Sequence, residues 1–110
     1  MAFDFVLDVV RKTYYRHAVI RSLQCSDTER LFARERVRRF VNIQETALRR
    51  LTALDGARES ADLRIPPSNR LEALRGDRAG QYSIGINAQY RICFRWQDND
   101  AYDVQIADYH

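Results

Sequence analysis

Basic and titratable side chains recur at strand spacing toward the C-terminal end of this sequence. Arg91 and Arg95 are two strand repeats apart, so a strand would carry both on one face. Tyr109 has the strand phase of Arg91, and the two can converge across a sheet. Cleavage of a phosphodiester without a metal needs a base, an acid and cations that stabilise the phosphorane. With Arg75 and Arg78 beside them, these residues predict that chemistry.

The histidines and the missing metal and nucleotide motifs narrow the possible classes of enzyme. His17 and His110 are the two histidines, and the sequence has no H-E-x-x-H, no paired C-x-x-C and no G-x-x-x-x-G-K motif. A metal enzyme is therefore not expected, and no cofactor is expected either. His110 is the final residue and can titrate near neutral pH. Two interpretations stay open for it, a proton-transfer group and a frayed terminal residue.

The stretch Arg70 to His110 must position these groups. It holds three runs of alternating apolar and polar residues, which predict an antiparallel meander. One face would form the core, with Ile84, Ile86, Ile92, Phe94, Trp96, Val104 and Ile106. The other face would lie open to solvent as an anion-binding hollow, with Ser83, Gly85, Arg91, Cys93, Arg95, Gln105, Ala107 and Tyr109.

Upstream residues predict a strand and two helices. Val19–Cys25 has strand character, and Ser26 with Glu29 forms a capping box for a short helix. A second helix is expected from about Val37 to Asp55, ended by Gly56 in a left-handed conformation. The fold class is α+β, with the N-terminal strand and the two helices packed on one face of a mostly antiparallel sheet of four to five strands.

The chain length is that of one domain with a modest core. Residues 1–18 are interpreted as an N-terminal extension of unknown role, either an accessory helix or the product of an upstream start codon, and residues 19–110 as the domain. No apolar run approaches a membrane span, and the basic start of a signal peptide is missing. Cys25 and Cys93 are expected to be reduced thiols, and the protein is expected to be cytoplasmic.

The positive charge is carried almost entirely by arginine. The formal net charge is +3, the pI is about 9.1, and Lys12 is the single lysine. Arginine binds phosphate through a planar fork, which favours a nucleic-acid partner, although a GC-rich genome also enriches arginine. The densest basic run, Arg34 to Arg39, is either a solvated face or a contact for RNA or an acidic partner.

Several segments together resemble the HigB toxins, which belong to the RelE/ParE superfamily of type II toxin–antitoxin systems. These segments are R-L-E-A-L-R-G-D-R-A-G-Q-Y-S-I, Q-Y-R-I-C-F-R-W and the terminal D-Y-H, with V-I-R-S-L and D-T-E-R-L-F upstream. The match runs from about Val19 to His110 and implies a RelE-like fold. It also implies a ribosome-dependent endoribonuclease that cuts translated mRNA without a metal, using the nucleotide's own 2′-hydroxyl.

The resemblance also implies roles for individual residues. Arg75 occupies a position where the family often has lysine, and Glu72 a position that can be histidine. Arg75 cannot transfer a proton but can hold a phosphate. The implied catalytic set is Glu72, Arg75, Arg91, Asp108, Tyr109 and His110, and the implied RNA-binding set is Arg70, Arg78, Gln89 and Arg95.

The implied partners are a HigA-type helix-turn-helix antitoxin, the decoding site of the ribosome and mRNA. Operator DNA would be reached only through the antitoxin, and no membrane is involved. Two alternatives remain. One is a ParE-like toxin that inhibits gyrase, and the other is a nucleic-acid-binding module or co-repressor without catalytic activity.

Overall fold

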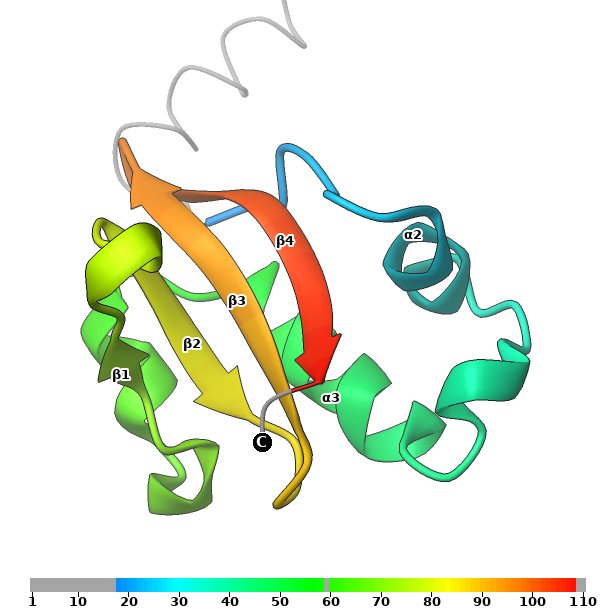
Figure 1. Cartoon of the computed structure of the whole chain (residues 1–110). Coiled ribbons are helices and arrows are strands. Elements are labelled where there is room, and N and C mark those ends of the chain that lie inside the picture. Colours follow the sequence, from blue (N-terminus) through cyan, green and yellow to red (C-terminus); the bar gives the residue numbers. More distant parts are fainter. Residues whose placement is uncertain (1–17, 59, 109–110) are drawn as a thin grey trace, which may run out of the picture.

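The computed structural model describes residues 18–58 and 60–108. Its centre is a four-stranded antiparallel sheet in the order β1-β2-β3-β4 (Figure 1). The strands are β1 (Glu72–Ala73), β2 (Gln81–Gly85), β3 (Tyr90–Gln97) and β4 (Asp100–Asp108). The α-helices are α2 (Ser26–Phe32) and α3 (Gln44–Leu54), and the 3₁₀ turns are η2 (Arg38–Phe40), η3 (Ser60–Arg64), η4 (Pro67–Asn69) and η5 (Gly76–Arg78).

Local turn chemistry fixes the register of the meander. Asp98 and Asn99 both have positive φ, 51° and 64°, as the two-residue type I′ turn between β3 and β4 requires. In the preceding turn, the Asn87 side chain accepts hydrogen bonds from the backbone N–H of Gln89 and Tyr90, both at 2.8 Å. The predicted meander is therefore confirmed, and its two hairpins have different turns.

One face of the sheet packs against α3, as predicted. The buried residues of this face are Ile84, Ile92, Phe94, Val104 and Ile106, with Ile86 and Trp96 partly buried beside them. From the other side they meet Phe40, Ala47, Leu51 and Leu54. Burying each large apolar side chain contributes about 1.5–3 kcal/mol to stability, so this interface is the main source of the fold's stability.

The predicted N-terminal strand is reduced to two isolated parallel bridges beside β4, Ile20 with Ala101 and Leu23 with Val104. Between them β4 carries a bulge, because Cys93 faces Gln105 whereas Arg95 faces Tyr102. The bulge interrupts the ladder, so a continuous fifth strand does not form.

Two predicted helix boundaries are wrong. The cap of α2 is Cys25, whose Sγ accepts the N–H of Thr28 at 3.5 Å, and the helix already begins at Ser26. The expected helix from Val37 to Asp55 is instead the turn η2 followed by α3, since Val37 is extended and the N-cap Ile43 is not helical.

The end of α3 also differs from the prediction. The C-cap residue Asp55 has φ −71°, and Gly56 is not among the glycines with positive φ. The Asp55 carboxylate accepts the N–H of Ile20 at 2.7 Å. A tertiary contact to the N-terminal segment, rather than a left-handed glycine, therefore accompanies the end of the helix.

Within the described residues, no helix combines the length and apolar character needed to cross a membrane. Cys25 and Cys93 are free cysteines; Cys93 is buried and Cys25 is partly exposed.

Candidate active site

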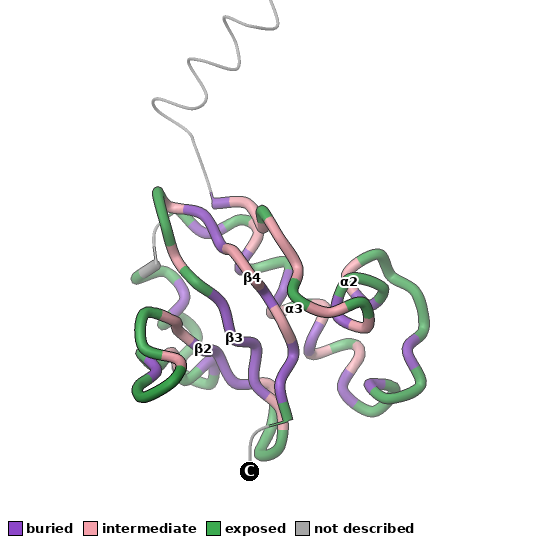
Figure 2. Tube along the Cα trace, turned by 45° about the horizontal axis from the view of Figure 1, so that its top comes forward, coloured by how far each residue is buried: buried purple, intermediate pink, exposed green. Residues whose placement is uncertain are grey.

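The sheet face opposite α3 is not open along its whole length, contrary to the prediction. Ser83, Arg91, Cys93 and Ala107 are buried there. Figure 2 shows buried stretches in β2, β3 and β4. Leu74, just after β1, packs in a small cluster with Cys93 and Ala107. The small residues that the sequence places on this face let the β1 segment lie close against it.

Arg91 is the central charged residue of this covered region. It is 8% exposed, and its Nε donates a 2.7 Å hydrogen bond to the Ser83 hydroxyl. Its Nη2 donates to the carbonyl oxygens of Arg70, at 2.5 Å, and Ser83, at 3.5 Å. The guanidinium group is therefore fixed along one side by neutral acceptors.

The remaining nitrogen of Arg91 faces Gly85. Nη1 makes no hydrogen bond within the described residues, and it lies 3.2 Å from where a Cβ at position 85 would stand. The Arg70 Nε is 3.9 Å from that same point. Because Gly85 has no side chain, the Arg91 guanidinium can pack closely against the backbone there.

Glu72 is the carboxylate nearest to Arg91 among the described ion pairs, with Oε2 3.9 Å from Nη2. Its side chain is 56% exposed, so this contact neutralises the buried charge only weakly. Glu72 and Arg75 line an open hollow of about 750 Å³ together with Ala73 and Leu74. The structure thus places Glu72 beside Arg91 and, in this hollow, near Arg75.

At the far end of β4, Asp108 meets the turn that precedes β3. The Gln89 Nε2 donates to the Asp108 Oδ2 at 3.1 Å. Asp108 pairs in register with Tyr90, and Ala107 pairs with Arg91. Asp108 and Gln89 therefore lie at the Arg91 end of the sheet. Tyr109 and His110 lie outside the described residues.

Arg78 and Arg95 lie farther along the same face. They line a second hollow of about 210 Å³ together with Gln24, Gln81, Asp103 and Gln105. Cys93 lies between this hollow and Arg91. Burial raises the pKa of its thiol, and the positive charges of Arg78 and Arg91 oppose that rise.

Of the predicted RNA-binding residues, Arg70 and Gln89 lie near Arg91, and Arg78 and Arg95 lie apart from it.

The sequence assigns no role to Arg50, which the structure places beside the end of β2. From α3 its Nε donates to the Gly85 carbonyl oxygen at 3.3 Å, and its Nη2 to the Ser68 hydroxyl at 3.4 Å. Helical periodicity places Arg50 beside the core stripe but does not reveal that the end of β2 lies within its reach. The alternation pattern placed Ser83 on the correct face of the sheet but did not indicate that its hydroxyl bonds to Arg91.

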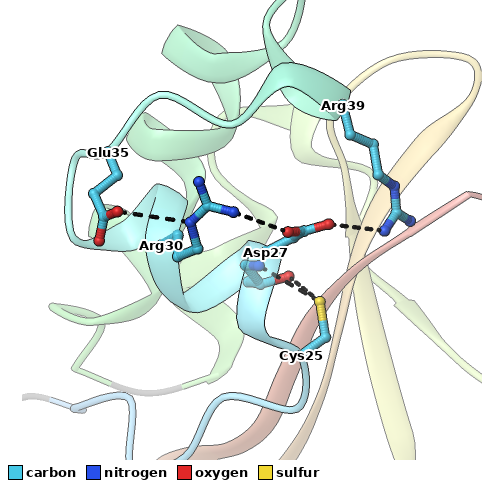
Figure 3. A network of polar contacts seen from close by, with 6 residues as sticks. Cys25, Asp27, Arg30, Glu35 and Arg39 are labelled. Carbon is cyan, nitrogen blue, oxygen red and sulfur yellow. Dashed lines mark hydrogen bonds and ion pairs between the residues drawn. The ribbon is translucent and has the colours of Figure 1, made fainter.

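The basic run Arg34 to Arg39 is partly paired within the chain. Asp27 bridges Arg30, at 3.6 Å, and Arg39, at 3.4 Å, and Arg30 also meets Glu35 at 3.6 Å (Figure 3). These exposed pairs join α2 to η2. Their geometry favours neither an RNA contact nor an acidic partner for the run.

Within the part of the chain that the structure describes, no group of three or more His, Cys, Asp or Glu side chains gathers that could hold a metal ion.

Similar proteins match most of the chain. The family model for the HigB-like toxin, a RelE-like toxin of the type II toxin–antitoxin system HigB, matches residues 21–110. Toxin HigB-1 of Vibrio cholerae is 47% identical over 60 residues, which cover 54% of this chain and 63% of that protein. Endoribonuclease HigB of Proteus vulgaris is 41% identical over 61 residues, which cover 56% of this chain and 65% of that protein. Each alignment spans slightly less than two thirds of the relative's length.

A solved structure supports the fold. A chain of the heterotetrameric YoeB–YefM toxin–antitoxin complex from Staphylococcus aureus superimposes with a TM-score of 0.52 at 16% identity, covering 86% of this chain and 99% of that chain. The family match and the shared fold agree with the α+β meander described above. The chain belongs to the HigB-like toxins, the RelE-like toxins of type II toxin–antitoxin systems.

Proposed function

We propose that the chain is a ribosome-dependent endoribonuclease that cleaves translated mRNA without a metal ion. The observation that carries the proposal is the buried guanidinium of Arg91, which neutral acceptors hold in place while Nη1 makes no hydrogen bond within the described residues. A buried cation with little neutralising charge around it favours an anionic ligand. The name of the Proteus vulgaris relative, endoribonuclease HigB, indicates a phosphodiester as that ligand.

In the proposed reaction the 2′-oxygen of a nucleotide attacks the adjacent phosphorus. Its proton passes to a base, a pentacovalent phosphorane forms, and the bond to the 5′-oxygen breaks as that oxygen takes up a proton. The products are a 2′,3′-cyclic phosphate and a 5′-hydroxyl. Arg91 and Arg75 hold the phosphoryl oxygens and stabilise the charge that develops on them.

The proton transfers are assigned to Glu72 and His110. The Glu72 Oε2 lies 3.9 Å from the Arg91 Nη2, so a phosphate bound at Arg91 would be close to this carboxylate. His110 donates the proton to the leaving oxygen. Tyr109 stacks on a base, and Asp108 with Gln89 orients the terminal segment.

Cleavage by the full chain in translating cells tests the assignment. Expression from a tightly controlled promoter should arrest growth and cut mRNA, and Arg91→Ala should abolish both effects. Glu72→Gln and removal of His110 should each weaken cleavage while the melting temperature stays unchanged. Arg49→Ala is the matched control, since Arg49 is an exposed arginine of α3 whose side chain is 66% accessible. Intact cleavage in the Arg91 and His110 variants together would refute the assignment.

A second assay separates this proposal from a gyrase-inhibiting toxin. A supercoiling assay with purified chain and gyrase should show no inhibition at concentrations that arrest growth. Inhibition of supercoiling without mRNA cleavage would replace the proposal by the ParE-like alternative. Binding of RNA without either effect would favour the module without catalytic activity.

The proposed partner is a HigA-type helix-turn-helix antitoxin, through which the pair reaches operator DNA. Membership of a toxin–antitoxin family supports it, and so does the complex that the Staphylococcus aureus toxin–antitoxin pair forms. Co-expression with a helix-turn-helix reading frame next to the gene should restore growth and yield a complex that elutes as one species.

A further inference from the structure

The hollow around Arg95 is lined by side chains from several parts of the chain. Its volume is about 210 Å³, and all of its lining side chains are polar. They come from the N-terminal segment, η5 and the three longer strands: Gln24, Arg78, Gln81, Arg95, Asp103 and Gln105. None of these residues is needed for the cleavage step proposed above.

The β-bulge in β4 shapes one wall of this hollow. Asp103 has φ 53°, a left-handed conformation that few residues other than glycine adopt. Its Oδ2 lies 3.2 Å from the Arg95 Nε, and its N–H donates to the Ser22 hydroxyl at 2.8 Å. Bulges often redirect a side chain beside a functional site. Here the bulge directs a carboxylate that holds Arg95 at the edge of the hollow.

The other side chains leave hydrogen-bonding groups available. The Arg78 Nη1 donates to the Gln81 Oε1 at 3.4 Å, which fixes the η5 side of the hollow. Within the described residues, the side-chain amides of Gln24 and Gln105 make no hydrogen bond. Each amide offers a donor and an acceptor side by side, the pattern that reads the edge of a nucleobase.

The hollow lies on the same face as Arg91. Arg95 lies four positions after Arg91 along β3, a span of about 13 Å, and the buried Cys93 lies between them. An RNA strand whose cleaved phosphate sits at Arg91 can reach the hollow by crossing the Leu74 segment, which packs on Cys93 and Ala107. Unpaired bases in RNA are commonly bound by side-chain hydrogen bonds and by arginine.

We propose that this hollow binds one unpaired RNA nucleotide flanking the cleaved bond. The glutamine amides contact the edge of its base, and Arg78 and Arg95 contact its phosphate. The inference rests on the proposed function for the identity of the strand, but binding of a nucleotide can be measured without cleavage.

Titration of the purified full chain with the four nucleoside 5′-monophosphates gives that measurement. These probes have no internucleotide bond to cleave. Side-chain amide signals of Gln81 and Gln105 should shift saturably in two-dimensional NMR spectra. Gln105→Leu and Arg95→Gln should each weaken binding at least about fivefold, and the matched controls Gln97→Leu and Arg49→Gln should not.

Inorganic phosphate is the second probe. If it binds as tightly as the best nucleotide, the base makes no contribution, and the proposal is overturned. Equal affinities of the hollow variants and their controls, or no saturable shift in the unmodified chain, would overturn it as well.

Sequencing of cleaved mRNA ends gives an independent measurement and separates the two proposals. In Gln105→Leu, cleavage should continue with an altered nucleotide frequency at one flanking position. If the unmodified chain cleaves and this frequency does not change, the hollow is not the nucleotide site although the proposed function stands. If the unmodified chain cleaves nothing, the proposed function fails, and the NMR titration still decides the inference.

Discussion

Arg91 has lost much of its side-chain freedom before any ligand binds. Its hydrogen bonds to Ser83 and to the Arg70 carbonyl oxygen hold the guanidinium plane in place. A long side chain that must be ordered on binding costs free energy at that step, about 0.5–1.5 kcal/mol. The Arg91 side chain is already ordered when the protein folds, so phosphate binding does not carry this free-energy cost. This favours a role for Arg91 in holding a phosphate.

Gly85→Ala tests the position of this guanidinium. The added Cβ would lie 3.2 Å from Nη1, so Arg91 must shift by a few tenths of an ångström. We expect mRNA cleavage to fall about tenfold or more, since small displacements at a reaction centre are costly, with less than about 1 kcal/mol lost in stability.

Gly56→Ala is its control, because the new Cβ meets only the Thr52 carbonyl oxygen, at 3.6 Å. Cleavage should be unchanged in that variant. Equal cleavage rates for the two alanine variants would contradict a role for the close packing of Arg91 against Gly85.

The Cys93 thiol gives a pH-dependent prediction. Burial raises its pKa in the folded chain, so above the ordinary thiol pKa of about 8.5 the unfolded chain ionises first. The free energy of unfolding should therefore decrease as the pH rises past that value. Urea unfolding between pH 7.5 and 9.5 should show this slope, and Cys93→Ala should reduce it. Identical slopes in both chains would show that Cys93 does not contribute.

Among the elements, α2 and β4 are joined by a single buried hydroxyl. The Thr28 Oγ1 accepts the N–H of Ile106 at 3.0 Å, and Thr28 is fully buried. The Cys25 Sγ lies 3.3 Å from the same hydroxyl. The cap of α2 and the strand that leads to Asp108 therefore share one hydrogen-bonding centre.

Thr28→Val should remove this hydrogen bond between α2 and β4. Valine keeps the shape but leaves the Ile106 N–H without its acceptor, which costs about 1–3 kcal/mol. Chemical unfolding measures the loss, and hydrogen exchange at the Ile106 amide should become faster. Thr52→Val is a suitable comparison, since its hydroxyl bonds only to the Leu48 carbonyl oxygen on an exposed helix face. If both variants lose the same stability, the Thr28 bond has no special importance.

The ion pairs between α2 and η2 should matter much less. Asp27→Asn removes the acid that pairs with Arg30 and Arg39, but these arginine side chains are each 50% exposed. Exposed pairs contribute about 0–1 kcal/mol, so the melting temperature should change little in 0.15 M salt. A loss well above 1 kcal/mol in chemical unfolding would contradict this estimate.

For the whole molecule, the sequence predicted the meander well because its alternation has a period of two over three consecutive runs. It also placed Ser83 and Arg91 on one face. It did not predict that Arg91 is buried, because the groups that surround this face include the Arg70 carbonyl oxygen, which bonds to Arg91, and Leu74, which packs on Cys93. These lie in segments without periodicity, where tertiary contacts decide the path of the chain.

The same reason explains the missed hollow around Arg95. Its glutamines are far apart in the sequence, and a β-bulge, which alternation alone does not reveal, brings Asp103 to Arg95. The cap at Cys25 was missed because serine is the better capping residue by propensity, whereas the thiol is held in place by Thr28.

Removing residues 1–17 tests the predicted domain as a whole. The core cluster that the structure describes is built from residues between Ala18 and Ile106, and the Ala18 N–H bonds to the Ala57 carbonyl oxygen. We expect the shortened chain to unfold cooperatively, with a melting temperature within a few degrees of the full chain. A non-cooperative transition would place the first 17 residues inside the folding unit.

The two edges of the sheet have a consequence for self-association. On one side the edge strand β1 is only two residues long. On the other side, the outward N–H groups of Ala101 and Val104 bond to the carbonyl oxygens of Val19 and Ser22, and that of Ile106 bonds to Thr28. Long unpaired edges are what allow copies of a protein to add strand to strand. Within the described residues neither edge offers such a template, so concentrated protein without a partner should resist growth into cross-β polymers.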